Sequence, residues 1–476
     1  MPATKKNIDQ PLFDKYPRIG VSAYSTDCIM GWDAIVNHIN AFLDKAEKPN
    51  FKIIFDCYQG VDQAELSKAI DKLNVKQSFD SASCFKSNDE VQSMVYPYIT
   101  DDRIFGKMSS LKIDDFFDEE KRNNVQEQIK RIQDPLIIYG LGAGALCEES
   151  DLFIYLDMPR WELQQRMRAA AVNNLGADNK DEDFSKLYKQ SFFMDWRVLD
   201  RYKQQTYDRW DYYMDTVKAN EPKMITGALL NRAYELAIAQ PFRLMPFFDP
   251  GPWGGQWLKE VIGLDKNKIN FAWGFDCVPE ENSLLLGFGD HTVEVPALNL
   301  VLEMPRELMG DFIYEKFGAE FPIRFDFLDT MDGGNLSLQV HPTTRYIHEQ
   351  FGMNYTQNES YYMLDVKEDA FVYLGLKNQT NADEMIRALK KAQGDGQNFD
   401  AEKFVKKWPV HKHDHFSIPA GTVHCSGKNS VVLEISATPY IFTFKLWDWG
   451  RLGLDGKPRP INIEHGEQVN NRDKEE

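Results

Sequence analysis

Short apolar runs alternate with amphipathic stretches from about residue 18 to residue 230. Runs of four to seven apolar residues between helix-period segments are typical of βα units. We therefore expect a doubly wound, mostly parallel sheet in the N-terminal half. Its predicted strands cover 18–23, 51–57, 136–139 and 152–156, and its first predicted helices cover 32–45 and 63–73.

Two further stretches, 161–171 and 187–218, are rich in charged and aromatic residues and predict a helical cap. From 240 to 255 the chain becomes rich in proline, glycine and aromatics and loses the helical period. We expect a domain boundary there, with an α/β domain at 1–240 and a second domain at 241–476.

The second half alternates in short segments that predict strands at 336–340, 360–366, 371–374, 416–419, 431–435 and 441–447. Strands of this length and spacing indicate an antiparallel barrel. One insertion, 381–407, has a helical pattern. The fold class expected for the whole chain is therefore α/β plus β.

The length of the chain agrees with this division. A chain of 476 residues exceeds what one core usually serves, so two domains are expected.

The net charge of −18 repels nucleic acid and anionic membranes, and any anionic substrate needs a locally positive pocket. Six scattered cysteines without a CxxC pair, and the absence of a long apolar run, predict a cytoplasmic protein with reduced thiols and no membrane partner.

Four residues of the second half form a candidate metal site. Gln339 and His341 lie two apart in a predicted strand, so their side chains point the same way. Glu359 begins the next strand, and His424 follows a Pro-Ala-Gly-Thr-Val turn. Two imidazoles, a carboxylate and an amide oxygen suit Zn²⁺, although a single strand histidine is more often structural.

The context of these four positions resembles that of type I phosphomannose isomerases. The matching segments are Ser-Leu-Gln-Val-His-Pro at 337–342, Glu-Ser-Tyr-Tyr at 359–362 and Pro-Ala-Gly-Thr-Val-His at 419–424. A Pro-Trp-Gly-Gly segment at 252–255 and an Asp-Trp-Gly-Arg segment at 448–451 extend the resemblance over about half the chain. The resemblance implies a cupin, that is a jelly-roll β-barrel, with the predicted helical insertion.

The same resemblance implies a function. The chain would interconvert mannose 6-phosphate and fructose 6-phosphate through an enediol, with one Zn²⁺ per chain. Glu434 matches a strand carboxylate that would transfer the proton, and Arg451 matches an arginine that would stabilise the enediolate or bind phosphate. Ser337 and Lys445 are the candidate substrate-binding residues. A solvent-facing Glu434, a surface Arg451 and a Ser337 that caps a strand end remain open alternatives.

The sequence also departs from the family at its cationic positions. The lysine that usually precedes the metal-ligand glutamate is missing from Thr-Gln-Asn-Glu at 356–359. A second family lysine is replaced near Asp326, and we expect the neighbouring Arg324 to face the other side of the strand. Because each charge-assisted contact contributes a few kcal/mol, an altered substrate or lost catalysis is the alternative. In that case the second half is a metal-binding module that binds or senses a sugar or sugar phosphate.

Three histidines, His411, His413 and His415, alternate in the sequence and would share a face if the segment were a strand. Such a cluster can form a second metal site or a pH-sensitive patch. It is more often a polar strand face or a turn, so we leave it out of the predicted site.

The N-terminal half lacks a nucleotide-binding signature. The strand at 18–23 is where a phosphate loop would follow the first strand of a nucleotide kinase, yet GxxxxGK[ST] is absent. Later segments resemble the strands and lid of uridine-kinase-like proteins, so we expect a degenerate P-loop-kinase-like domain. The glycines at 140–144 predict a strand-to-helix turn, and Arg160, Arg166 and Arg168 either bind an anion or are solvated. A transferase that still uses nucleotide is a further alternative, which the missing loop argues against.

Overall fold

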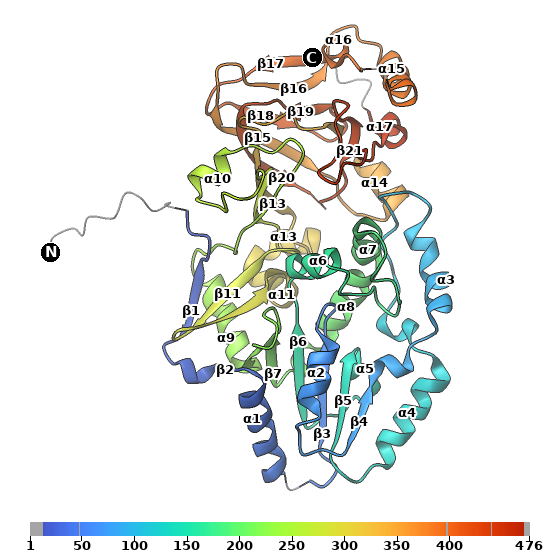
Figure 1. Ribbon diagram of the computed structural model, residues 1–476, viewed down its shortest axis with the longest axis vertical. Helices are drawn as coiled ribbons and strands as arrows, with labels where there is room; N and C mark the ends of the chain where they lie inside the picture. Colours follow the sequence, from blue (N-terminus) through green and yellow to red (C-terminus); the bar gives the residue numbers. More distant parts are fainter. Residues whose placement is uncertain (1–12, 47, 397, 439, 471–476) are drawn as a thin grey trace, which may run out of the picture. The chain divides into compact units, whose positions relative to one another are not determined.

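The computed structural model describes residues 13–46, 48–396, 398–438 and 440–470 (Figure 1). It is a mixed α/β structure with four sheets. Its contacts divide the chain into two compact units, and neither unit is continuous in sequence. One unit contains Pro17–Met245 and Pro279–Phe321, and the other contains Pro246–Val278, Pro322–Glu476 and the N-terminal segment Met1–Tyr16, each as far as it is described. The boundary near residue 240 stays a prediction for independently folding domains.

The first unit is built on a seven-stranded sheet. The strand order is β2 (Ile29–Met30), β8 (Lys223–Thr226), β7 (Tyr212–Asp215), β6 (Leu152–Asp157), β3 (Lys52–Cys57), β5 (Leu136–Leu141) and β4 (Gln77–Asp80). The four pairings from β7 to β4 are parallel, and β8 and β2 add antiparallel pairings at the other edge. Strands β3 and β6 are almost wholly buried, as expected for parallel strands with helices on both faces.

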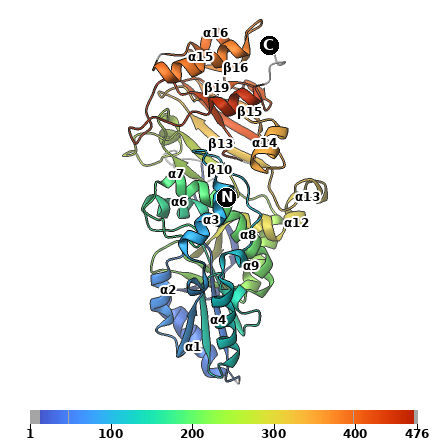
Figure 2. The same ribbon diagram turned by 90° about the vertical axis from the view of Figure 1, so that its right-hand side faces the viewer.

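Helices cover this sheet. The inner faces of α1 (Trp32–Lys45) and α2 (Gln63–Ile70) pack on one face of the sheet in a single apolar core. Figure 2 shows α4 (Glu119–Arg131) on the opposite side of the sheet from these two helices. The remaining helices of this part are α3 (Asn88–Ile99), α5 (Ala143–Leu146), α6 (Arg160–Arg168), α7 (Phe184–Gln190), α8 (Trp196–Thr206) and α9 (Gly227–Ile238).

Two predictions for this unit were wrong in detail. The strand predicted at 18–23 forms β1 (Arg18–Ser22), but β1 pairs in parallel with β11 (Ser283–Phe288) in a separate sheet that β12 (His291–Pro296) completes. Its exposed positions, including Arg18, do not suit a strand covered on both faces. The helical stretch predicted at 187–218 also contains β7, because aromatic residues such as Tyr212 and Tyr213 favour a buried strand.

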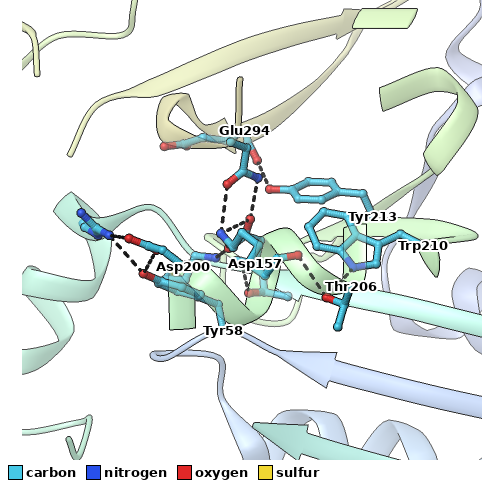
Figure 3. A network of polar contacts seen from close by, with 12 residues as sticks. Tyr58, Asp157, Asp200, Thr206, Trp210, Tyr213 and Glu294 are labelled. Atoms are coloured by element: carbon cyan, nitrogen blue, oxygen red, sulfur yellow. Dashed lines mark hydrogen bonds and ion pairs between the residues drawn. The ribbon is translucent and has the colours of Figure 1, made fainter. Parts of the chain in front are cut away.

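The inserted segment Pro279–Phe321 adds β11, β12, α11 (Ala297–Glu303), α12 (Pro305–Met309) and α13 (Asp311–Phe317). A buried polar network attaches α11 to the parallel sheet (Figure 3). The ammonium of Lys203 on α8 donates to both carboxylate oxygens of Asp157, at 2.8 and 2.9 Å, and to Asn299 on α11, at 3.0 Å. The Asn299 amide in turn donates to Asp157 at 2.8 Å. Burial without these mutual bonds would be strongly unfavourable for each group.

The second unit contains two sheets. The larger has the order β18 (His415–Ile418), β15 (Asn358–Val366), β20 (Ser430–Ala437), β13 (Ile323–Asp329), β10 (Trp273–Cys277) and β9 (Phe247–Asp249). The smaller has the order β17 (Val405–Pro409), β16 (Phe371–Leu376), β19 (His424–Ser426), β14 (Leu338–Val340) and β21 (Phe444–Trp447). All pairings in both sheets are antiparallel. Among the described residues the two sheets do not close into one hydrogen-bonded barrel.

The six strand segments predicted for this half all contain strands, and the predicted insertion forms α15 (Ala382–Asp395) and α16 (Ala401–Phe404) before entering β17. Three further helices, α10 (Trp257–Val261), α14 (Thr344–Phe351) and α17 (Ile463–Val469), complete the unit.

The Lys203 network yields a stability prediction. Replacing Lys203 with Met leaves Asp157 buried without its counter-charge, so we expect the free energy of unfolding to fall by about 3–5 kcal/mol. Lys186→Met removes an exposed ion pair to Glu182 and should leave stability nearly unchanged. Urea denaturation of the two variants beside the wild type measures both effects. Equal stabilities of the two variants would show that the network does not hold this unit together.

Candidate metal centre

The predicted ligands come from two different sheets. Gln339 on β14 and His424 on β19 are direct partners across antiparallel strands of the five-stranded sheet. His341 follows the end of β14, and Glu359 lies on β15 of the six-stranded sheet. All four side chains are buried. Two sheets therefore bring together residues that are far apart in the sequence.

The donor atoms of three of these residues lie within 4.8 Å of one another. The Glu359 carboxylate is 3.1 Å from His341 Nε2 through Oε2 and 2.6 Å from His424 Nε2 through Oε1. Neither His341 Nε2 nor Glu359 Oε1 makes a hydrogen bond, although both atoms are fully buried. Buried polar atoms that converge in this way without hydrogen bonds need another partner.

The outer nitrogens of the two imidazoles explain this arrangement. His341 Nδ1 lies 3.1 Å from the carbonyl oxygen of Phe442, and His424 Nδ1 lies 2.9 Å from that of Thr422. Since a carbonyl only accepts, each Nδ1 carries the proton, and in a neutral ring each Nε2 presents a lone pair. Two lone pairs and a carboxylate facing one another repel unless a cation lies between them. This is the usual orientation of histidines that bind metal.

These residues fit a divalent cation such as Zn²⁺. Two imidazole nitrogens and a carboxylate oxygen are the ligand set of many catalytic zinc sites, which keep a further position open. The Gln339 amide lies beside them, with its nitrogen 3.2 Å from His424 Nε2. A half-turn of that amide presents its oxygen instead, which is the atom that would bind a metal. The role of Gln339 as a fourth ligand stays a prediction.

Further carboxylates surround the three donors. Glu434 on β20 is the register partner of Asp326 on β13 and of Tyr361 on β15. Gln357 donates to Glu359 at 2.7 Å and to Glu434 at 3.2 Å. Burial, together with the charge of Glu359, raises the pKa of Asp326 to about 8. Burial and the charges of Asp326 and Glu359 raise the pKa of Glu434 well above its usual range. Burial works in the same direction on Glu359; positive charge at His341 and His424 would outweigh it and hold the pKa of Glu359 well below the ordinary value.

The expected orientation of Arg324 was wrong. Arg324 and Asp326 are two residues apart on β13, and both are buried. Their neighbours Ile323 and Phe325 are more exposed. Side chains two apart share a face of a strand, so Arg324 lies on the same face as Asp326. Its register partner on β20 is Ser436, which in turn pairs with Glu359.

A cationic cluster lies on the five-stranded sheet. Lys445 on β21 is the register partner of Gln339. Asp448 follows the same strand and accepts hydrogen bonds from Arg451 Nη2 at 2.6 Å, Arg459 Nη1 at 2.9 Å and the Ser337 hydroxyl at 2.8 Å. Burial and the charge of Arg459 lower the pKa of Lys445 to about 8. Three cations around a single carboxylate form a positive region beside Gln339.

The structure therefore groups the predicted residues in two sets. Glu434 lies near the metal donors, whereas Ser337, Lys445 and Arg451 belong to the cationic cluster. The Arg451 guanidinium donates to Asp448 and to the carbonyl oxygen of Asn335, so its contacts in this structure are structural. Their catalytic and substrate-binding roles stay predictions.

Three features of the site were not predicted from the sequence: Arg459, Asp448 as the centre of the cluster, and Gln357 as the link between two carboxylates. Arg459 stands between two prolines in an irregular segment, and no periodicity points to it. The three histidines near residue 413 do not form a strand face, because a turn contains His411 and His413 and only His415 lies on β18.

Metal analysis tests the ligand assignment. His341→Ala removes one of three converging donors, and we expect the purified variant to lose most of its bound zinc. His413→Ala, which removes an imidazole on an exposed turn, should keep the zinc content of the wild type. Elemental analysis after dialysis measures both variants, and full zinc occupancy in His341→Ala would refute the assignment.

None of the described helices has the length and apolar character needed to cross a membrane.

Comparison with known proteins finds two kinds of similarity. A family described as a domain of unknown function (DUF8485) matches residues 31–239. Mannose-6-phosphate isomerase ManA of Bacillus subtilis is 26% identical over 238 residues, which cover 48% of this chain and 68% of ManA. The mannose-6-phosphate isomerase of Streptococcus mutans is 27% identical over 239 residues, covering 49% and 68%. The crystal structure of the mannose 6-phosphate isomerase from Bacillus subtilis superposes on 49% of this chain, and on 69% of its own, with a TM-score of 0.41 and 21% identity. About half of the chain is thus similar to mannose-6-phosphate isomerases.

Proposed function

We propose that the chain is a metal-dependent aldose-ketose isomerase that interconverts mannose 6-phosphate and fructose 6-phosphate. The observation that carries the proposal is the convergence of His341, Glu359 and His424 in a chain half of which resembles mannose-6-phosphate isomerases. On this proposal the two sheets of the second unit form a cupin, and the metal is Zn²⁺ held by these three residues and Gln339.

A bound Zn²⁺ would stabilise the negative charge that develops on the sugar oxygens as a proton moves between C1 and C2. The chain itself must supply the group that moves the proton. Glu434 lies beside the donors, and Gln357 fixes its Oε1 by a hydrogen bond of 3.2 Å. A second hydrogen bond, from Thr438 to the Gln357 oxygen at 2.9 Å, sets the direction of that amide. A carboxyl group held at one atom in this way suits general acid-base catalysis.

The cationic cluster would bind the phosphate. Lys445 and Arg459 approach from β21 and from the segment after it, and Ser337 offers a hydroxyl just before β14. Arginine and lysine donors bind phosphate oxygens by charge-assisted hydrogen bonds. The register of Lys445 with Gln339 supports a substrate that extends from the metal donors to the cluster.

Two positions favour an alternative function. The segment 356–359 and the strand near Asp326 lack the lysines that the resembling family carries, and Asp326 adds a carboxylate beside Glu359. A site that has exchanged two cations for an amide and an acid is suited to binding without turnover. On this alternative the second unit is a metal-binding module that senses a sugar or sugar phosphate.

Turnover of mannose 6-phosphate distinguishes the isomerase from the sensing module. Zinc-loaded protein supplied with mannose 6-phosphate should form fructose 6-phosphate, detected by a coupled assay. Glu434→Gln should keep its zinc and lower kcat by about 10²- to 10⁴-fold, because it loses the proton-transferring group. Glu349→Gln, on the exposed side of α14, should behave as the wild type. Zinc-loaded protein that binds mannose 6-phosphate but forms no product would establish the sensing alternative.

A further inference from the structure

A cavity of about 550 Å³ opens in the first unit, apart from the metal centre. It lies where β3 and β5 end, and its lining includes Gly60 and Val61 after β3, Leu141 at the end of β5, and the segment 171–178 after α6. The volume is in the range of small-molecule sites.

The strand order explains why a cavity forms there. After β3 the chain passes through α2 to β4, which lies beyond β5 in the sheet. After β5 it passes through α5 in the opposite direction to β6, which lies beyond β3. Since such crossovers are right-handed, the two helices leave the adjacent strands toward opposite faces of the sheet. The crevice between the carboxyl ends of such strands is where open α/β sheets bind ligands.

Carboxylates occupy the positions at which a phosphate would bind. Asp62 caps α2 and accepts hydrogen bonds from the backbone amides of Ala64 and Glu65, at 2.9 and 3.0 Å. On β3, the buried Asp56 accepts from the amides of Gly142 and Gly144 in the turn after β5, at 3.1 and 3.0 Å. Backbone amides after a sheet strand are the usual cradle for phosphate. Asp62 belongs to the lining and fills the cradle at the start of α2 with negative charge, so the cavity disfavours a phosphorylated ligand there. Asp56, which is not part of the lining, fills the second cradle.

The cations of the lining are also engaged by the protein. Arg166 Nη1 donates to the carbonyl oxygen of Gly60, and its Nη2 donates to that of Val217, each at 2.9 Å. Lys86 donates to the carbonyl oxygen of Asp115. With Asp62 and Asp178 on the same lining, the two positive and two negative side chains cancel. The lining therefore has no net charge with which to attract an anion.

The rest of the lining combines flat apolar surface with amides. Phe85, stacked on Phe117 at 5.1 Å, forms one wall, and Val61 and Leu141 add apolar surface. The side-chain amides of the lining come from Gln59, Gln63, Asn88, Asn173 and Asn174. Gln59 and Asn174 both donate to the buried Asp195, at 3.1 and 2.6 Å, and these hydrogen bonds fix the orientation of both amides in the lining.

We propose that this cavity binds an uncharged ring compound that carries hydroxyl groups and no phosphate, namely a free sugar or a nucleoside. The apolar face of such a ring would lie against Phe85, and its hydroxyls would exchange hydrogen bonds with the amides of Gln63, Asn88 and Asn173. The amides of Gln59 and Asn174 are already bound to Asp195. This inference goes beyond the proposed isomerase activity and does not depend on the metal centre.

Isothermal titration of the full-length protein tests the proposal with matched probes: glucose and glucose 6-phosphate, adenosine and AMP. Ala82→Phe places a ring in the cavity from an exposed lining position, and Ala239→Phe is the control at an exposed alanine outside the lining. We expect glucose or adenosine to bind the wild type and Ala239→Phe, and to lose at least tenfold in affinity with Ala82→Phe. The sugar and nucleoside arms identify which source supplies the ring. The proposal is overturned if neither uncharged probe shows binding that Ala82→Phe weakens.

A second variant tests the exclusion of phosphate. Asp62→Asn keeps a residue that caps α2 but removes the negative charge. We expect it to raise the affinity for the phosphate ester at the cavity by about fivefold, as the loss of a charge repulsion near a protein surface implies, and to leave the uncharged probe unchanged. A wild-type protein whose cavity binds the phosphate ester more tightly than its uncharged partner would contradict the proposal. Melting curves of each variant confirm that it is folded.

Discussion

The second unit depends on one electrostatic constraint, the burial of the Glu359 carboxylate between two imidazoles whose Nε2 atoms face it. The carbonyl oxygens of Phe442 and Thr422 fix the outer proton of each ring, so the inner nitrogens have no proton to offer Glu359 while the rings are neutral. A fully buried carboxylate in that setting is stable with a cation between the three groups. The pairing of β14 with β19 and the placement of β15 on the other sheet supply the geometry.

The carboxylates around this centre show how the two halves of the site differ. Asp326, Glu359 and Glu434 occupy the six-stranded sheet, whereas Lys445, Arg451 and Arg459 gather on the five-stranded sheet around Asp448. A substrate with an anionic end and a hydroxyl-bearing end would find complementary charge along this direction. In the first unit, by contrast, Asp56 and Asp62 accept hydrogen bonds from the backbone amides that would otherwise bind an anion.

The sequence predicted much of this arrangement where a local signal existed. The buried runs at 51–57 and 152–156 are strands of the parallel sheet, and the alternation in 336–341 contains β14, where Gln339 pairs with His424. Pairing between distant strands had no such signal. The separate sheet of β1 depends on β11, far away in the chain, and the cluster at Asp448 depends on Arg459 in an irregular segment. The error over Arg324 was one of strand geometry, since residues two apart share a face.

We infer that His341, Glu359 and His424 hold a metal ion together. X-ray absorption at the zinc edge on the zinc-loaded protein tests it most directly. We expect a first shell of only nitrogen and oxygen at about 2.0–2.2 Å, with the outer-shell scattering of two imidazoles. A sulfur ligand at about 2.3 Å, or a spectrum without imidazole scattering, would contradict it.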